Sequence, residues 1–142
     1  MEVSLGVFAG VIFMLYSIYF SKIITGKPEQ FELEMLKSLA NWMIERGSAS
    51  RLQIWLMLLS SFILEIAYFL LVIYLIENQA LLLFTFAFAG IEIVHIITLF
   101  ISFYRFFAGK LILKNIFRWR LERVSAFLFF THSFLVIMAL WL

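Results

Sequence analysis

The sequence contains no cysteine and a single proline, and most of its length has neither lysine nor arginine. Without cysteine the chain cannot form disulfides, thiolate metal sites, CxxC redox pairs, iron–sulfur clusters or a covalently attached c-type haem. The motifs G-x-S-x-G, Walker A, GxGxxG and HExxH are also absent. The first residues lack the basic leader of a cleaved signal peptide, so we expect the N-terminal apolar stretch to remain as a span.

Most of the sequence consists of apolar residues. They make up 65% of the 142 residues, and the mean hydropathy is +1.06. A helix needs about 20 mostly apolar residues to cross a bilayer. Four stretches satisfy this length, at about 3–21, 52–76, 80–103 and 124–142. The sequence therefore predicts an all-α, four-helix transmembrane bundle that forms a single domain over 1–142.

The positive charges lie in two short segments. All eleven lysines and arginines fall within 22–51 and 105–123, and the connection between the second and third spans has none. Basic residues favour cytoplasmic loops. We therefore expect a multi-pass protein of the cell (plasma) membrane, with both basic loops in the cytoplasm and both termini outside.

The first basic segment has the signals of a further helix. Pro28, followed by acidic residues, is typical of a helix start, and Gly47 is typical of a helix end. Between them apolar residues recur at helical spacing, namely Phe31, Met35, Leu39, Trp42 and Met43. This pattern predicts an amphipathic interfacial helix over about 28–46. It would either anchor the chain or provide a surface for a partner.

The second basic segment suggests contact with lipid. Lys110, Lys114 and Arg118 recur every four residues, which would align them along one side of a helix. Such a stripe favours anionic headgroups, so the lipid bilayer is the expected partner. Nucleic acid is a poor alternative, because apolar anchors surround the segment.

Small residues in the first span predict close helix packing. Gly6 and Gly10 form a GxxxG pattern, and Ser17 lies in the same narrow arc. In lipid, close approach of small residues is a main source of helix association. The contact would lie within the bundle or in a homo-oligomer.

Four ionisable side chains lie deep inside the predicted spans: Glu65, Glu92, His95 and His132. At about 1.5 Å per residue, all four lie roughly 12–18 Å from the basic ends of their spans, near the midplane. Charge at this depth costs at least ~2.5 kcal/mol per group, so such residues usually face the protein interior. We therefore expect the four side chains to converge on one interior site.

The chemistry of such a site stays open between several interpretations. Glu92 and His95, one turn apart, could bind a single divalent metal ion together with Glu65 and His132. Alternatively, His95 and His132 could be the two axial ligands of haem b. The same groups could also relay protons. Finally, they could only hold the bundle in register, by pairing with one another, with Tyr68 or with another subunit.

The absence of a large extramembrane domain and the uniform apolar faces favour one function over the others. We expect a subunit or accessory of a larger membrane complex, with a membrane-protein partner or a second copy of the chain. A membrane redox protein that binds haem b or a metal is the alternative, followed by a small proton-coupled transporter. An enzyme is not favoured.

Overall fold

The computed structural model describes residues 1–26 and 28–141, and these residues are helical apart from their connections. The elements are α1 (Glu2–Ile24), α2 (Pro28–Arg46), α3 (Ala49–Leu75), α4 (Gln79–Phe107), the short 3₁₀ helix η1 (Leu113–Asn115) and α5 (Trp119–Trp141). Helices α1, α3, α4 and α5 have 23, 27, 29 and 23 residues and are apolar enough to cross a membrane. At about 1.5 Å per residue, each exceeds the ~30 Å of a hydrocarbon core. The prediction of four long apolar helices in a helical protein is confirmed.

The helices extend beyond the predicted spans at their charged ends. Helix α3 begins at Ala49 rather than 52, α4 continues to Phe107 rather than 103, and α5 begins at Trp119 rather than 124. Hydropathy falls at basic residues such as Arg51 and Arg105, but the backbone hydrogen bonds continue through them. Apolar patterning therefore locates the apolar part of each long helix and not the helix ends.

Local residues explain where the helices stop. The Asn78 side chain accepts a hydrogen bond from the Leu81 amide at 3.0 Å and so caps α4. Gly109 follows the end of α4 with φ +76°, and Gly47 follows α2 with φ +62°. Both conformations are left-handed and favour glycine. The predicted helix from Pro28 to the residue before Gly47 is confirmed in its bounds.

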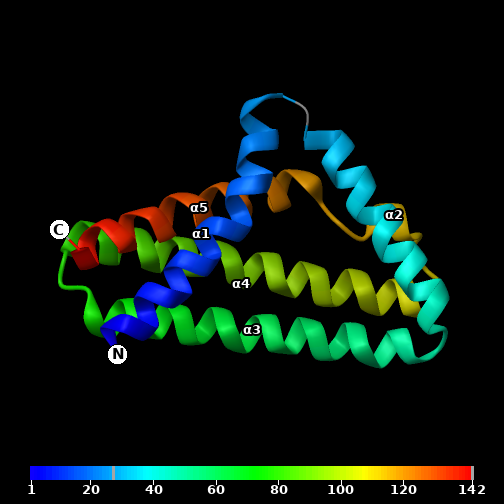
Figure 1. Ribbon diagram of the computed structural model, residues 1–142. Coiled ribbons are helices and arrows are strands. Elements are labelled where there is room, and N and C mark those ends of the chain that lie inside the picture. Colours follow the sequence, from blue (N-terminus) through cyan, green and yellow to red (C-terminus); the bar gives the residue numbers. More distant parts are fainter. Residues whose placement is uncertain (27, 142) are drawn as a thin grey trace.

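Two long helices form the base of the molecule (Figure 1). Helices α3 and α4 run antiparallel, and α5 lies along them, while α1 crosses the bundle obliquely and packs most extensively on α5. The start of α1 and the end of α5 lie at the end where α3 connects to α4. The opposite end carries α2 and the 108–118 segment. We call it the basic end, because every described lysine and arginine lies in α2, in this segment or in the adjoining turns of the spans.

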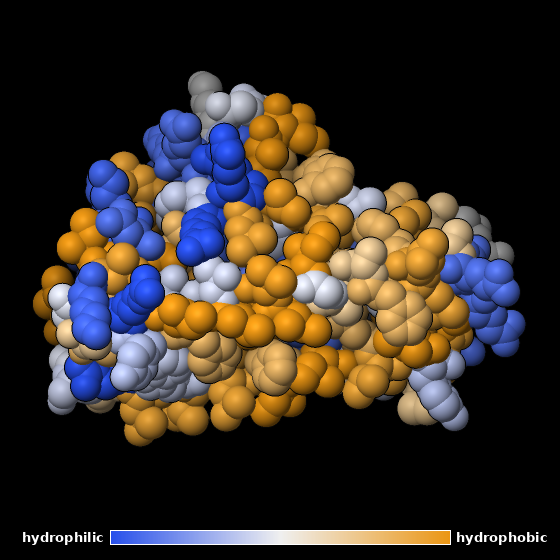
Figure 2. Space-filling view, turned by 180° about the vertical axis from the view of Figure 1, so that it is seen from behind, coloured by the Kyte–Doolittle hydropathy of each residue, from blue (hydrophilic) through white to orange (hydrophobic). Residues whose placement is uncertain are grey.

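The surface matches this division. Figure 2 shows a broad apolar band between hydrophilic groups at the two ends of the molecule. Large apolar side chains along the spans are exposed, including Ile63 (56%), Leu70 (60%) and Val94 (58%). Such exposure of large apolar residues suits a lipid environment or contact with other chains.

The buried apolar residues form two clusters. One lies between the four long helices and includes Leu5, Tyr68, Val72 and Val136. The second lies at the basic end, where Ile54, Phe103 and Ile116 are buried against partly buried residues that include Leu39, Trp42 and Met43 of α2. Part of the predicted apolar stripe of α2 therefore packs on the protein itself.

Candidate functional site

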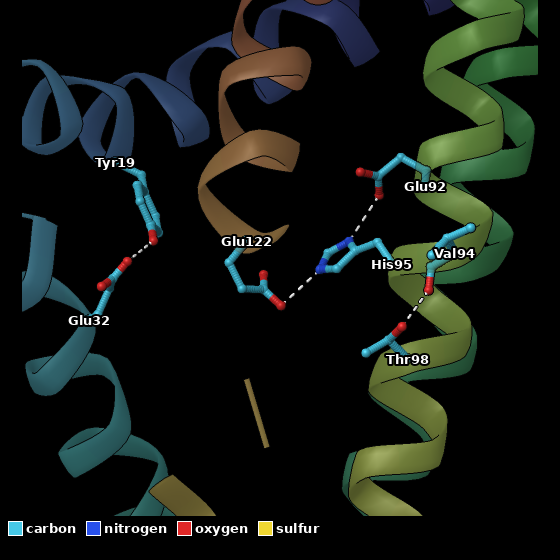
Figure 3. A network of polar contacts seen from close by, with 7 residues as sticks. All are labelled: Tyr19, Glu32, Glu92, Val94, His95, Thr98 and Glu122. Carbon is cyan, nitrogen blue, oxygen red and sulfur yellow. Dashed lines mark hydrogen bonds and ion pairs between the residues drawn. The ribbon is translucent and has the colours of Figure 1, made fainter. Parts of the chain in front are cut away.

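The central group of the candidate site is the imidazole of His95. Helix α4 places His95 one turn after Glu92, and both side chains are buried, with 8% and 1% of each residue exposed. Nδ1 of His95 lies 3.2 Å from Oε2 of Glu92, and Nε2 lies 2.8 Å from Oε1 of Glu122. Figure 3 shows the ring between the two carboxyl groups, one on its own helix and one at the start of α5. His95 therefore bridges two acidic side chains.

Sequence reasoning missed Glu122, because it placed this residue in the basic connection. The residue lies in the first turn of α5, where its partly buried side chain contacts His95. A signal was present in the sequence. Glu122, Ser125, Phe129 and His132 follow one another at helical spacing, and the last three are buried on the inner face of α5.

Glu65 of α3 and Glu92 of α4 flank a small cavity. The cavity has a volume of about 140 Å³, and both residues border it. Its other walls are apolar: Phe62, Ile66, Phe69, Leu70, Ala89, Ile93 and Ile96. We call it the α3–α4 hollow. Ile66, Leu70 and Ile93 are more than a third exposed, so the hollow lies toward the outer face of these two helices.

Each acid of the hollow keeps one oxygen without a partner. Within the described residues, Oε2 of Glu65 and Oε1 of Glu92 are buried and form no hydrogen bond. Buried polar atoms are normally paired, and an unpaired buried charge is especially costly. Each free oxygen therefore requires a proton, a cation, a water molecule or a group from another molecule.

We call these four residues, Glu65, Glu92, His95 and Glu122, the Glu–His cluster. It contains three carboxyl groups and one imidazole, and charges on Glu92, His95 and Glu122 act on Glu65. A fully protonated His95 balances only one carboxylate. The cluster can therefore be neutral only when it binds additional positive charge, and a proton is the smallest carrier of such charge.

His132 belongs to a different network. Its Nδ1 lies 2.7 Å from the Tyr68 hydroxyl, and its Nε2 lies 2.7 Å from the Thr85 hydroxyl. Thr85 donates its own proton to the Leu81 carbonyl oxygen at 2.7 Å, so it must accept from Nε2–H. Nδ1 then accepts from Tyr68. When the imidazole is neutral, every donor and acceptor in this hydrogen-bonded series therefore has a partner.

An aromatic layer lies between the two networks. Phe88 packs against Phe129 and Phe69 with ring centroids 4.7 and 5.2 Å apart, and all three side chains are buried. Phe88 lies between Glu92 and Thr85 along α4. On α5, Phe129 lies between Glu122 and His132. The layer separates the satisfied network from the unsatisfied one.

The predicted site residues thus fall into two groups. The structure brings Glu65, Glu92 and His95 together, and it gives His132 separate partners. The predicted pairing of a buried histidine with Tyr68 is present. Within the described residues, no three His, Cys, Asp or Glu side chains are arranged to hold a metal ion. Ligation of haem b or metal by His132 would require the loss of one of its two hydrogen bonds.

The predicted packing residues of α1 also differ from one another. A Cβ atom on Gly6 would lie 3.2 Å from the Trp141 ring, so Gly6 marks a close approach to α5. A Cβ atom on Gly10 would meet nothing within 4 Å. Ser17 donates a hydrogen bond to the Met14 carbonyl of its own helix at 2.7 Å. Only the first glycine of the GxxxG pattern is used within the described chain.

The basic residues predicted to bind headgroups do not form a helical stripe. The sequence-based expectation of one helical face is wrong, because Gly109 ends α4 and the 108–118 segment contains only the three residues of η1. Lys110 and Arg118 line two hollows beside the end of α4, and Lys114 lines a groove beside α2. Their role toward lipid stays a prediction.

A separate polar contact joins α2 to the rest of the bundle. Sequence reasoning missed this contact, as it missed Glu122. The Arg123 guanidinium donates two hydrogen bonds to Glu32, from Nε at 2.9 Å and from a terminal nitrogen at 2.7 Å. Glu32 is 3% exposed, and the Tyr19 hydroxyl also donates to it. Figure 3 shows Tyr19 of α1 pointing to Glu32 of α2. We call this group the α2 latch.

Comparison with known proteins gives no family for the chain. No family model matches it, and neither a curated protein nor a solved structure matches it. Function must therefore be argued from the site itself.

Proposed function

We propose that this chain is an accessory subunit of a larger membrane assembly, in which the Glu–His cluster carries protons from the basic end to mid-membrane. One observation supports this most directly: Glu65 and Glu92 border the same hollow, each with a buried carboxyl oxygen that lacks a hydrogen-bond partner, and His95 links Glu92 to Glu122. Ionisable groups inside membrane spans are commonly proton relays.

The contacts provide a simple route. Glu122 lies in the first turn of α5, where the chain leaves the basic end. A proton passes from Glu122 to Nε2 of His95, and the proton on Nδ1 passes to Glu92. One proton enters the imidazole and one leaves, so the ring regains its original charge. From Glu92 the proton passes to Glu65, which borders the same hollow.

The position of the hollow argues for a partner. The route ends between α3 and α4, where exposed Leu70 and Ile93 border the hollow. Beyond it toward the termini lies the aromatic layer, and then a network around His132 in which each group already has its hydrogen-bond partner. A second copy of the chain or another membrane protein would accept the proton from Glu65 at this face. The same face supplies the large apolar surface that a membrane partner contacts.

The proposal includes an orientation. We place the basic end in the cytoplasm, with both termini on the outer side of the plasma membrane. The distribution of lysine and arginine supports this placement. Protons would then enter the cluster from the cytoplasmic side.

Infrared spectroscopy tests the relay directly. A protonated carboxyl group in an apolar site has a C=O stretching band that shifts when its proton exchanges with deuterium. We expect such a band in the purified protein, its loss or reduction in Glu92→Gln, and its persistence in His95→Gln. Glutamine at 95 can still form hydrogen bonds but cannot carry a proton. We therefore expect exchange to slow on the order of 10²-fold in His95→Gln.

A matched control uses an acid away from the cluster. Glu45 is exposed in α2, and Glu45→Gln should leave both the band and its exchange rate unchanged. Equal exchange rates in the wild type and in His95→Gln would refute the relay. Absence of any protonated carboxyl band that depends on Glu65 or Glu92 would refute the cluster as a proton site.

A second experiment tests the partner. Because the chain has no native cysteine, a single cysteine at Leu70 places one reactive group beside the hollow. We expect a bifunctional crosslinker in native membranes to join this residue to a second copy or to one defined protein. A single cysteine at Phe86 provides the control. Phe86 lies in α4, does not line the hollow and is 58% exposed. A product that is equally abundant from both positions would refute a specific interface at the hollow.

A further inference from the structure

The end of α4 forms a second candidate site that is unrelated to the Glu–His cluster. A hollow of about 520 Å³ lies at the basic end and is lined by Trp55, Phe100, Ile101, Tyr104, Arg105 and Lys110. Trp55 belongs to α3, whereas Lys110 follows α4. The hollow therefore lies between the two longest helices.

The hollow has an apolar part and a charged part in a fixed order. Phe100 and Ile101 lie in α4 more than a turn deeper in the membrane than Arg105, and Lys110 lies beyond the helix end. The rings of Phe100 and Trp55 stack with centroids 5.7 Å apart and form one wall. An aromatic wall at membrane depth followed by two cations at the interface has the polarity of a phospholipid, with its acyl chain inside and its phosphate outside.

A smaller hollow continues the charged part. Its volume is about 140 Å³, it shares Ile101 and Arg105 with the first, and it adds Ser102, Asn115 and Arg118 as possible hydrogen-bond donors. Arg105 therefore faces both hollows. Of the described residues that line either hollow, none is acidic. The positive charge of the lining residues therefore favours an anion, because no acidic residue among them balances it.

The walls of the larger hollow are held in place by their own contacts. Arg51 of α3 donates a hydrogen bond to the Phe107 carbonyl at 3.3 Å, and its guanidinium lies 5.2 Å from the Phe107 ring centre. The Phe107 ring in turn lies 5.8 Å from Trp55. These contacts join the start of α3 to the end of α4, so the groove between them is part of the folded structure.

We propose that this groove binds an anionic phospholipid, with the headgroup phosphodiester between Arg105 and Lys110 and an acyl chain against Trp55, Phe100 and Ile101. The inference does not depend on the proton relay. The shape favours a lipid over a free phosphate, because most of the wall is apolar and lies at acyl-chain depth. A free phosphate would use only the two cations.

The test is native mass spectrometry of the full chain in detergent, titrated with phosphatidylglycerol and, separately, with phosphatidylcholine. We expect phosphatidylglycerol to bind at one preferred site with clear selectivity. Each cation near a headgroup contributes about a fivefold effect. The double variant Arg105→Gln/Lys110→Gln should therefore bind phosphatidylglycerol on the order of 30-fold more weakly.

The matched control is Arg46→Gln/Arg120→Gln, which removes two exposed cations from the same end of the molecule but from neither hollow. It should bind like the wild type. Tyr104→Ala, which alters an exposed wall residue, should weaken phosphatidylglycerol severalfold while leaving both cations in place.

Three results would overturn the proposal. The two double variants would lose affinity equally if general surface charge were responsible. Phosphatidylcholine, whose phosphodiester is balanced by a choline cation, would bind as well as phosphatidylglycerol if the net negative charge of the headgroup played no part. Soluble glycerol phosphate would bind as tightly as the lipid if the acyl-chain wall played no part.

Discussion

The α2 latch provides a sharp test of the fold, because its two partners differ in burial. Glu32 is almost completely buried, whereas 31% of the Arg123 side chain is exposed. Removing either partner breaks the same two hydrogen bonds. The charge that remains is different, however, and so is the cost of leaving it unpaired.

In Glu32→Gln the remaining guanidinium can be hydrated where it is exposed. The loss is then that of charge-assisted hydrogen bonds, about 1.5–3 kcal/mol. In Arg123→Gln the carboxylate of Glu32 remains buried, with Tyr19 as its donor. An uncompensated buried charge costs about 3–5 kcal/mol. We therefore expect Arg123→Gln to be the more destabilising single variant.

The double variant completes the cycle. With both partners replaced by glutamine no buried charge remains, so its loss of stability should fall below the sum of the single losses by on the order of 2–3 kcal/mol. The assay is equilibrium unfolding in mixed detergent micelles, followed by circular dichroism. Arg120→Gln, an exposed neighbour, should change stability by no more than about 0.5 kcal/mol. Additive losses, or a larger loss for Glu32→Gln than for Arg123→Gln, would refute the reasoning.

Three further predictions follow from the spans and loops. Tyr68→Phe leaves Nδ1 of His132 without its donor and should destabilise the protein by about 1–2 kcal/mol in the same unfolding assay, and no loss would contradict the assigned hydrogen bond. Gly6→Ala should lower the stability of the monomer, whereas Gly10→Ala should leave it unchanged. If crosslinking shows that only Gly10→Ala loses an oligomer, the second glycine contacts a partner. A cysteine at Lys114 should react with a membrane-impermeant maleimide only after cells are opened, and labelling of intact cells would reverse the proposed orientation.

Apolar patterning was sufficient to predict the long helices, because a bilayer requires about 20 apolar residues in a row and helices satisfy their own backbone hydrogen bonds. It also predicted α2 from Pro28 and Gly47. It did not predict the ends of α3, α4 and α5, since charged residues continue a helix after the apolar stretch stops. Nor did it predict the irregular 108–118 segment, where helical spacing of three cations suggested a helix, but α4 ends before Gly109 and only the short η1 follows.

The candidate site was predictable in its helices but not in its pairings. Depth alone identified Glu65, Glu92, His95 and His132, because counting residues from the basic ends predicts that all four lie near mid-membrane. Partner choice depends on the rotation of each helix about its axis, which packing sets and hydropathy does not. Glu122 of α5 pairs with His95 of α4, so His132, ten residues further along α5, lies at the level of Thr85 instead. The same limit hid the α2 latch, because its residues come from three separate helices.

Hydrogen-bond satisfaction distinguishes the roles of the two histidines better than their depth does. His132 has a donor on one nitrogen and an acceptor on the other, and aromatic rings surround it, so no carboxyl group is beside it to exchange a proton. His95 has a carboxyl group on each nitrogen, so it can take a proton from one and give a proton to the other. The contacts of His132 stabilise a single neutral form of its imidazole. The contacts of His95 allow two forms, in which one or the other ring nitrogen carries the proton. A proton relay requires the second kind, which is why we assign transfer to His95 and structural stability to His132.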